Sequence, residues 1–434
     1  MTSLGKTDPI LILGGGTFGL STALHLLRSG FTNITVLDSS NALPSSNSAG
    51  NDLNKIVRAE YENPFYVDLA LEAIEKGWKT PLFAPYYHQT GYLMLCSGEA
   101  SEKPIKSMLK ARASVESHPA FKGGIQSAES RSDIQRLAWQ LDGPLSGFRG
   151  YYNPLAGYAH SANAQRGLAE YLATQGVRFI LGTNAGTAKK LLYEDDRCIG
   201  VETQDGKTRF ASLTVCALGA NNASLIPQIS SFTTARCWAV AHIQLTDREC
   251  DILRGLPVVN VRDLGFFFEP DPATKLLKLC HLGGAYTNTN SEGISLPSTT
   301  PVADFVPKED ELKLRQLLRE AIPWLADRPF VDTKMCWFSD SVDSEFCIDF
   351  VSGTKQSLIA LAGDSGHGFK MLPIFGQWVV ELLKAGMQRR KQWRWKQGSG
   401  QGQDWGSSVS WRVGEAQELR DVILKEAPRL KAKL

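Results

Sequence analysis

Residues 10–38 read ILILGGGTFGLSTALHLLRSGFTNITVLD, and they carry the clearest structural pattern in the chain. The apolar run at 10–13 predicts a short strand buried in a parallel sheet. Glycines follow at positions 14, 16 and 19, and apolar residues then recur at helical spacing until Gly30. A second strand ends in Asp38. The segment therefore predicts the strand, turn, helix, strand unit of a dinucleotide-binding domain.

Each part of this unit has a physical role in holding a dinucleotide. Gly14 permits the tight turn, Gly16 lets the backbone approach a pyrophosphate, and Gly19 lets helix and strand pack closely. The helix N-terminus offers free N–H groups and a partial positive charge to the phosphates. Asp38 can accept hydrogen bonds from the ribose hydroxyls of an adenosine. The pattern fits NAD and FAD equally, so other parts of the chain must separate them.

Length and charge limit the remaining choices. The chain has 434 residues, more than one hydrophobic core usually serves, so we expect two domains. Its net charge of +2 gives no electrostatic reason to expect nucleic acid or an acidic membrane as a partner. No apolar run reaches the roughly 18 residues of a membrane span, and the N-terminus lacks the apolar region of a signal peptide.

The cysteines and the C-terminus indicate a cellular compartment. Eight cysteines are spread without CxxC pairs, which argues against a metal site or a disulfide scaffold and favours a reducing compartment. The last three residues, Ala432, Lys433 and Leu434, differ by one small residue from the Ser-Lys-Leu peroxisomal address. They predict import into the peroxisome through its receptor, with the cytoplasm as the alternative.

Further pieces of the dinucleotide-binding domain lie far along the sequence. A hairpin turning at Asp205 and Gly206 precedes an apolar strand that leaves Gly219 where a backbone can approach a dinucleotide. Residues 357–386 repeat the order of strand, glycine-rich turn and helix. Alternating segments between these pieces predict an antiparallel sheet. Residues 150–160 read as a loop.

We therefore expect an α/β plus antiparallel β fold, in which a mixed-sheet substrate domain is inserted into a Rossmann-like FAD- or NAD-binding domain. The predicted boundaries are 1–80, 150–225 and 330–390 for the binding domain, 81–149 and 226–329 for the substrate domain, and 391–434 for a partly ordered C-terminal extension.

Five motifs in this order resemble the D-amino-acid-oxidase-like superfamily of flavoproteins: GGGTFGLSTALHLLRSGFTNITVLD, SAGNDLNKI, GFFFEPD, CWFSDSVDSEFCID and GDSGHGFKMLP. More narrowly, nearly the whole chain up to about residue 390 resembles the fungal fructosyl amino acid oxidases (amadoriases) and bacterial monomeric sarcosine oxidase. The resemblance implies FAD as the cofactor. It also implies that Cys336 anchors FAD covalently through the flavin 8α-methyl, a carbon that a thiolate can attack.

The resemblance assigns catalytic roles to several cationic residues. It implies that Lys278 promotes the reaction of reduced flavin with O2, because a buried cation stabilises the negative charge that develops on oxygen. Lys370 and Arg58 match residues that bind the substrate carboxylate, and Lys55 matches a basic residue over the flavin. Arg412 aligns loosely with a substrate arginine. The predicted cofactor-binding residues are Gly14, Gly16, Thr17, Phe18, Gly19, Asp38, Ser39, Ser48, Gly50, Asn54, Lys55, Ala185, Gly219, Cys336, Asp364, Gly366, His367, Gly368, Phe369 and Lys370. The predicted substrate-binding residues are Arg58, Phe267, His281, Leu282, Lys370 and Arg412.

One motif departs from the pattern of the sugar-amine oxidases. Those enzymes carry K-x-C-D-E at the active-site lysine, whereas this chain reads KLCHL, with His281 and Leu282 in the acidic positions. Sarcosine oxidase has a histidine at the second of these positions, and Leu282 does not match that residue either. A carboxylate for a cationic amine or for sugar hydroxyls is therefore missing. The change favours an N-alkyl or cyclic amino acid, or an amine intermediate of a fungal secondary pathway, over a fructosyl substrate.

Together these observations predict a monomeric FAD-dependent oxidase that acts on a secondary amine and O2. The carbon adjacent to the deprotonated amine nitrogen gives up a hydride to the flavin, and the resulting imine is hydrolysed unless it cyclises first. Oxygen then reoxidises the flavin and leaves H2O2. Within this class, a fructosyl amino acid oxidase and a saccharopine or pipecolate oxidase are the alternatives. A nicotinamide-dependent dehydrogenase and a flavoprotein without turnover are the alternatives from other classes.

Overall fold

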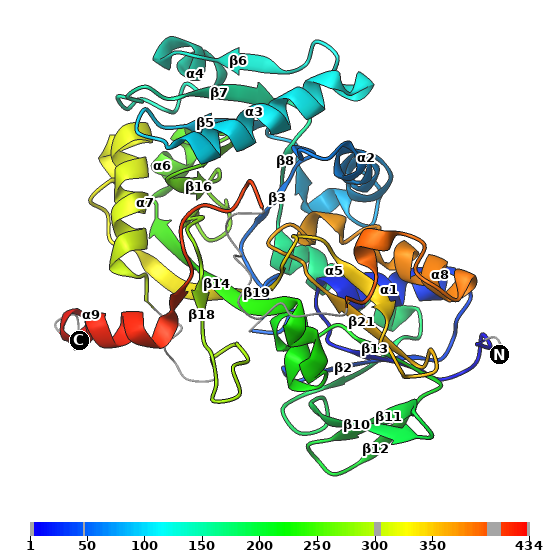
Figure 1. Ribbon diagram of the computed structural model, residues 1–434. Coiled ribbons are helices and arrows are strands. Elements are labelled where there is room, and N and C mark those ends of the chain that lie inside the picture. Colours follow the sequence, from blue (N-terminus) through cyan, green and yellow to red (C-terminus); the bar gives the residue numbers. More distant parts are fainter. Residues whose placement is uncertain (1–3, 47, 299–304, 397–408, 432–434) are drawn as a thin grey trace.

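The computed structural model describes residues 4–46, 48–298, 305–396 and 409–431. Its N-terminal segment forms the centre of a parallel sheet (Figure 1). The pairings β1–β2, β1–β13, β2–β9 and β13–β21 are parallel, and only β20 runs antiparallel at the edge. In the described part of the chain, the order of this six-stranded sheet is β20 (Cys347–Phe350), β21 (Leu358–Ala362), β13 (Leu213–Cys216), β1 (Ile10–Leu13), β2 (Ile34–Asp38) and β9 (Arg178–Leu181). Strands from both ends of the sequence thus meet in one sheet, as the scattered motifs predict.

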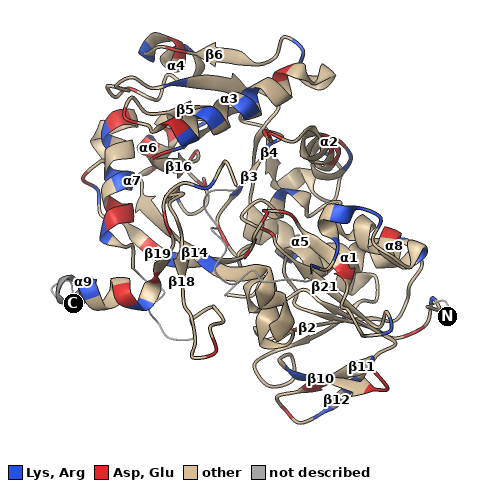
Figure 2. Ribbon diagram, in the orientation of Figure 1, with Lys and Arg blue, Asp and Glu red and all other residues tan. Residues whose placement is uncertain are grey.

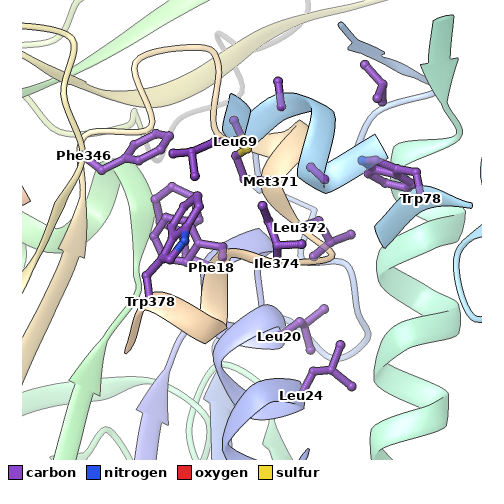
Figure 3. Close-up of a cluster of buried hydrophobic side chains, with 14 of the residues drawn as sticks. Phe18, Leu20, Leu24, Leu69, Trp78, Phe346, Met371, Leu372, Ile374 and Trp378 are labelled. Carbon is purple, nitrogen blue, oxygen red and sulfur yellow. The ribbon is translucent and has the colours of Figure 1, made fainter. Parts of the chain in front are cut away.

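Helices cover this sheet and bury its apolar residues. α1 packs against α5 and α8. Phe18 at the start of α1 stacks on Phe375 of α8, with ring centroids 3.7 Å apart. Figure 3 shows Phe18 beside Phe346 and Trp378, with Leu20 and Leu24 further along α1. Through Phe18, this cluster packs the start of α1 against residues from the C-terminal third of the chain. The described helices are α1 (Thr17–Arg28), α2 (Pro64–Ala73), α3 (Glu102–Ser117), α4 (Arg131–Leu137), α5 (Ser161–Thr174), α6 (Asp247–Ile252), α7 (Lys308–Ala321), α8 (Phe375–Ala385) and α9 (Leu419–Lys431).

A second, larger sheet carries the predicted antiparallel strands. Its long strand β14 pairs with β17, β18 and β19, each antiparallel. The strands of this sheet are β22 (Gln417–Glu418), β18 (Tyr286–Thr287), β14 (Thr233–Gln244), β17 (Leu276–Cys280), β16 (Gly265–Phe267), β15 (Val258–Val261), β5 (Tyr92–Cys96), β7 (Arg149–Asn153) and β6 (Gln126–Ala128), with β19 (Val331–Ser341) paired to β14 off this path. β19 lies inside the segment that the sequence assigns to the binding domain, so its pairing ties the two predicted domains together.

Two small sheets complete the fold. One is β10 (Ala188–Glu194), β11 (Arg197–Thr203) and β12 (Thr208–Phe210); the other is β3 (Lys55–Val57), β8 (Gly157–Ala159) and β4 (Tyr87–His88). The predicted hairpin turn at Asp205 and Gly206 joins β11 to β12. The prediction of a loop at 150–160 was wrong, because these residues form most of β7 and all of β8. β7 pairs with β5 and β8 pairs with β3, and both partners are distant in the sequence.

The outer surface is electrostatically mixed. Acidic and basic segments alternate along α3 and α7 (Figure 2), in keeping with the small net charge of the chain. Among the residues that the structure describes, no helix is both long and apolar enough to cross a membrane. All eight cysteines are free thiols.

The C-terminal segment is more integrated than the predicted extension. Trp393 is fully buried in the main core, and its Nε1 donates to the hydroxyl of Tyr66 at 3.0 Å. β22 adds a parallel strand to β18. The Gly/Gln/Ser-rich stretch 397–408 and the terminal tripeptide 432–434 lie outside the described residues.

Candidate active site

A cavity of about 750 Å³ opens at the carboxyl ends of the parallel strands and extends to the larger sheet. Gly14 and Gly16 line its start, and no side chain caps α1, so the first N–H groups of the helix remain available to a phosphate. Gly14 has φ of 102°, and a Cβ there would lie 2.4 Å from the carbonyl oxygen of Ala217. A Cβ at Gly19 would lie 1.9 Å from the carbonyl oxygen of Gly14. These glycines therefore allow the close approach that the sequence predicts.

Asp38 closes β2 at the edge of the cavity. Its carboxylate accepts hydrogen bonds from the backbone N–H of Gly15 and of Ser40, each at 2.9 Å. Burial raises its pKa, and these two bonds oppose the rise. The backbone thus fixes the carboxylate at the place where an adenosine ribose is expected.

A buried carboxylate holds three lysines, two of which line the cavity. Asp52 lies 2.6 Å from Lys278 Nζ, 2.8 Å from Lys55 Nζ and 3.6 Å from Lys334 Nζ. Burial opposes its charged form, but the three lysines hold the pKa of Asp52 well below its usual range. Lys278 also donates to the backbone oxygen of Asn54 at 2.7 Å. The loop 52–55 therefore positions two cavity lysines through one acid.

Two of the lysines that share Asp52, Lys278 and Lys55, differ in the direction of their pKa shifts. Lys278 has a side chain exposed by only 1%, and burial lowers its pKa to about 8 despite the contact with Asp52. For Lys55 burial acts in the same direction, but Asp52 and Cys336 prevail and raise its pKa. Lys278 is thus a cation that can lose its charge near neutral pH, whereas Lys55 stays charged.

Cys336 lies on β19 and faces the cavity. Lys55 Nζ donates to its Sγ at 3.5 Å, and the backbone oxygen of Ala49 lies 3.8 Å from the same Sγ. In contrast, Cys347 is fully buried in a hydrophobic cluster with Cys216 and Cys198. Of this pair of cysteines in the motif, only Cys336 is accessible from the cavity.

A second group of cations lines the part of the cavity near β3. Arg58 lies over the rings of Tyr61 and Tyr92, at 5.6 Å from each centroid. Arg262 is 5% exposed and donates to the backbone oxygen of Trp411 at 3.0 Å. Within the described part of the chain, neither arginine forms an ion pair with a carboxylate. The site can therefore accept negative charge from a ligand.

Lys370 lines the same cavity and sits in a hydrogen-bonded chain. Its Nζ donates to the hydroxyl of Tyr61 at 2.9 Å and to the backbone oxygen of His367 at 2.8 Å. The Tyr61 hydroxyl also lies 3.0 Å from His367 Nδ1. Burial lowers the pKa of Lys370 well below its usual range and lowers that of His367 to about 3.

Most of the residues expected at the site line one cavity. They are Gly14, Gly16, Thr17, Phe18, Asp38, Ser39, Ser48, Gly50, Lys55, Arg58, Gly219, Lys278, Leu282, Cys336, Asp364, Gly366, His367, Gly368, Phe369 and Lys370. Asp364 accepts from the backbone N–H groups of Ser339 and Gly366, and burial raises its pKa to about 6. Residues from six separate segments of the sequence thus converge, as the motifs imply.

Three of the expected substrate residues do not line the cavity. Phe267 points into the core, because the alternation of β16 turns Phe266 to the cavity instead. His281 Nδ1 donates to the backbone oxygen of Leu264 at 2.7 Å. Arg412 forms an ion pair with the buried carboxylate of Asp340.

Three of the expected cofactor residues also lie outside the lining. Gly19 packs against Gly14, and Asn54 is fully buried. Ala185 does not line the cavity, but its neighbour Gly186 does.

Comparison with known proteins gives the family. A family model for FAD dependent oxidoreductases matches residues 9–382. The chain belongs to this family. The predicted kinship with D-amino-acid-oxidase-like flavoproteins is thereby confirmed, and a nicotinamide-dependent dehydrogenase is set aside.

This FAD-dependent oxidoreductase has relatives over nearly its full length. It is 34% identical over 436 residues to L-saccharopine oxidase of Schizosaccharomyces pombe, covering 93% of this chain and 95% of that protein. It is 22% identical to a monomeric sarcosine oxidase of Bacillus sp., covering 87% of this chain and 93% of the relative. The crystal structure of the deglycating fructosamine oxidase of Aspergillus fumigatus (Amadoriase II) superposes with a TM-score of 0.86 at 32% identity, covering 96% and 97% of the two chains.

The residues present fit FAD. The glycine cradle at the start of α1, the carboxylate of Asp38 and the backbone at Gly219 line one continuous cavity with Cys336 and Lys278. This FAD-dependent oxidoreductase thus lines one cavity both with the uncapped N-terminus of α1, which suits a phosphate, and with the buried cation of Lys278. The sequence missed Asp52, Glu60 and Arg262, since a lone acid or arginine at a strand end carries no motif.

Proposed function

We propose that this enzyme oxidises the secondary amine of an N-substituted amino acid that carries more than one carboxylate, and that it releases H2O2. The observation that carries the proposal is the pair of arginines on the cavity wall, Arg58 and Arg262. Arg262 is 5% exposed, and in the described residues neither arginine has a carboxylate within ion-pair distance. Burying unpaired cations is unfavourable, so substrate carboxylates supply the missing charges.

Saccharopine has this chemistry, because it joins the side-chain nitrogen of lysine to a glutarate through a secondary amine and carries three carboxylates. The similarity to an L-saccharopine oxidase over nearly the whole chain supports the same choice. Leu282 and Phe266 on the cavity wall would contact the aliphatic part of such a substrate. We therefore place saccharopine-like secondary amines first among the substrates.

A fructosyl amino acid is the second candidate, supported by the likeness to Amadoriase II. Leu282 argues against it, because it presents a hydrocarbon side chain to the cavity where a sugar would require hydrogen-bonding groups.

Gly14, Gly16 and Asp38 would hold FAD, which would supply a hydride acceptor for the carbon beside the amine nitrogen and a route for the electrons to O2. The chain itself binds and orients the substrate. Arg58 offers a planar guanidinium for bidentate pairing with the α-carboxylate, and Arg262 is placed for a second carboxylate. Lys278 supplies a buried positive charge for the reaction with oxygen, and Asp52 holds its ammonium in place.

We also propose that FAD is bound covalently through Cys336. The support is its position on the cavity wall, where its Sγ faces the space for the flavin and accepts a hydrogen bond from Lys55 Nζ at 3.5 Å. The protein would then stay yellow after acid precipitation and after gel filtration in denaturant.

The substrate proposal is tested by H2O2 release from the purified yellow protein with matched amines. The panel is saccharopine, N-methylglutamate, sarcosine, pipecolate and fructosyl-lysine. We expect the highest kcat/KM for saccharopine and a higher value for N-methylglutamate than for sarcosine, which differs from it by the propionate arm. Equal values for N-methylglutamate and sarcosine, or the highest value for fructosyl-lysine, would contradict the proposal.

A further inference from the structure

Lys370 combines burial with an unusual set of hydrogen bonds. Its Nζ donates to two neutral oxygens, the hydroxyl of Tyr61 and the backbone oxygen of His367. In the described residues no carboxylate lies within ion-pair distance of this nitrogen. Burial lowers the pKa of Lys370 well below its usual range, and the charge of Arg58 acts in the same direction while Glu60 opposes it. The surroundings therefore favour the neutral amine in the free enzyme.

The direction of each hydrogen bond around Tyr61 can be derived. His367 Nε2 lies 2.9 Å from the backbone oxygen of Ser344, which can only accept, so Nε2 carries the hydrogen. Because burial keeps the imidazole neutral, Nδ1 is then an acceptor, and the Tyr61 hydroxyl donates its one hydrogen to it at 3.0 Å. The oxygen of Tyr61 is thus left as an acceptor for Lys370.

This chain of bonds fixes the orientation of the amine. A neutral lysine has two N–H bonds and one lone pair, and both N–H bonds are used by Tyr61 and His367. The remaining tetrahedral position is the lone pair. Lys370 lines the same cavity as Arg58, so its Nζ is open to a ligand there.

We propose that Lys370 is the base that takes the proton from the substrate's ammonium group, and that Tyr61 and His367 are the positioning residues that aim its lone pair. The inference rests on the proposed oxidation of a secondary amine. The substrate arrives as a zwitterion and must become a neutral amine before its carbon can give up a hydride. One N–H bond of the substrate breaks, one N–H bond forms at Lys370 Nζ, and no proton leaves the site.

The charges after this transfer are favourable. The new ammonium of Lys370 and the guanidinium of Arg58 both attract the substrate carboxylate, so the binding role and the proton-accepting role of Lys370 follow one another. The other ionisable groups facing Lys370 are Glu60, Tyr61 and His367. Burial raises the pKa of Tyr61, so its hydroxyl stays protonated and keeps the chain of bonds intact.

The test measures flavin bleaching by the best amine of the panel in anaerobic stopped-flow, with Lys370→Arg and Lys370→Ala compared. Lys370→Arg provides a cation for the substrate carboxylate but no base, because a guanidinium stays protonated at any pH at which the enzyme can be assayed. We expect its substrate Kd to stay within about threefold of the native value while the bleaching rate falls by about 100-fold or more. The rate should then rise about tenfold per pH unit, because free base must come from solution.

Chemical rescue separates a base from a mere positive charge. We expect ethylamine to restore bleaching in Lys370→Ala in proportion to its neutral form, and tetramethylammonium, which has no proton to exchange, to restore nothing. Tyr61→Phe should lower the bleaching rate less than Lys370→Arg and leave Kd nearly unchanged. The inference is overturned if Lys370→Arg bleaches at a near-native rate, or if tetramethylammonium rescues as well as ethylamine. If no amine bleaches the native flavin, the proposed function fails before any variant is made, and this inference falls with it.

Discussion

Lys278 Nζ lies 2.6 Å from Asp52 Oδ2, and both side chains are almost completely inaccessible to solvent. The same carboxylate also contacts Lys55 and Lys334. One acid therefore fixes two lysines of the cavity wall, Lys278 and Lys55. The arrangement ties the conformation of residues 52–55 to the role in the oxygen reaction that we propose for Lys278.

The charge of Lys278 predicts the pH dependence of reoxidation. Burial lowers its pKa to about 8, so the ammonium is present below that pH and is lost above it. Because the charged form stabilises negative charge on oxygen, we expect the reoxidation rate of the reduced enzyme to fall as the pH rises through about 8. Mixing reduced enzyme with O2 at several pH values measures this. Lys278→Met should be slower by about 100-fold and show no such fall. A native rate that is constant from pH 7 to 9.5 would argue against the role.

Removing the acid should affect both stability and reoxidation. Asp52→Asn leaves three lysines without their counter-charge, and we expect a loss of about 3–5 kcal/mol in the free energy of unfolding. The pH at which reoxidation declines should also shift downward, since Asp52 favours the charged form of Lys278. Denaturant unfolding gives the first quantity. As a control, Glu75→Gln breaks the exposed pair with Lys79 and should cost less than about 1 kcal/mol. Equal losses in the two variants would contradict the assignment.

Covalent flavin attachment can be assigned with a matched pair of cysteines. Cys336 and Cys280 both line the cavity, but only Cys336 is the predicted anchor. We expect Cys336→Ser to release its yellow colour into the supernatant on acid precipitation, and Cys280→Ser to keep the colour in the pellet. The physical reason is that the hydroxyl of serine is a much weaker nucleophile than a thiolate. Colour retained in the pellet of Cys336→Ser would place the bond elsewhere.

Arg262 should distinguish substrates by their second carboxylate. Arg262→Met removes the buried positive charge and puts an uncharged, unbranched side chain in its place. Loss of a charge-assisted hydrogen bond costs about 1.5–3 kcal/mol of binding free energy. We therefore expect kcat/KM for N-methylglutamate to fall by about 10- to 100-fold and that for sarcosine to change little. Arg58→Met should lower both values. If Arg262→Met affected both substrates equally, Arg262 would have a structural role or would bind the α-carboxylate.

The fold could be predicted further than the site. The segment 10–38 specifies its own local structure, because its periodicity, glycines and terminal acid agree, and β1, α1 and β2 lie where the sequence places them. The strands at 150–160 could not be found locally, since they are stabilised by partners distant in sequence. For the same reason Trp393, in a segment expected to be an extension, is part of the core.

At the site, motif residues converge but their partners do not follow from the sequence. Phe266 lines the cavity in place of the predicted Phe267, because alternate residues of β16 point to opposite faces of the sheet. A run of three phenylalanines does not show which of them points to the cavity. Arg412 is held by Asp340, which lies 72 residues away. The hydrogen bonds that join Lys370 to Tyr61 depend on segments about 300 residues apart. Such pairings require the folded chain.

The most direct test of the proposed substrate class is an anaerobic titration of the yellow protein with saccharopine. We expect the flavin absorbance to bleach with one equivalent of substrate, and the colour to return on admission of air with one H2O2 formed per flavin. A flavin that is not bleached by saccharopine but is bleached by fructosyl-lysine would contradict the assignment to carboxylate-rich secondary amines.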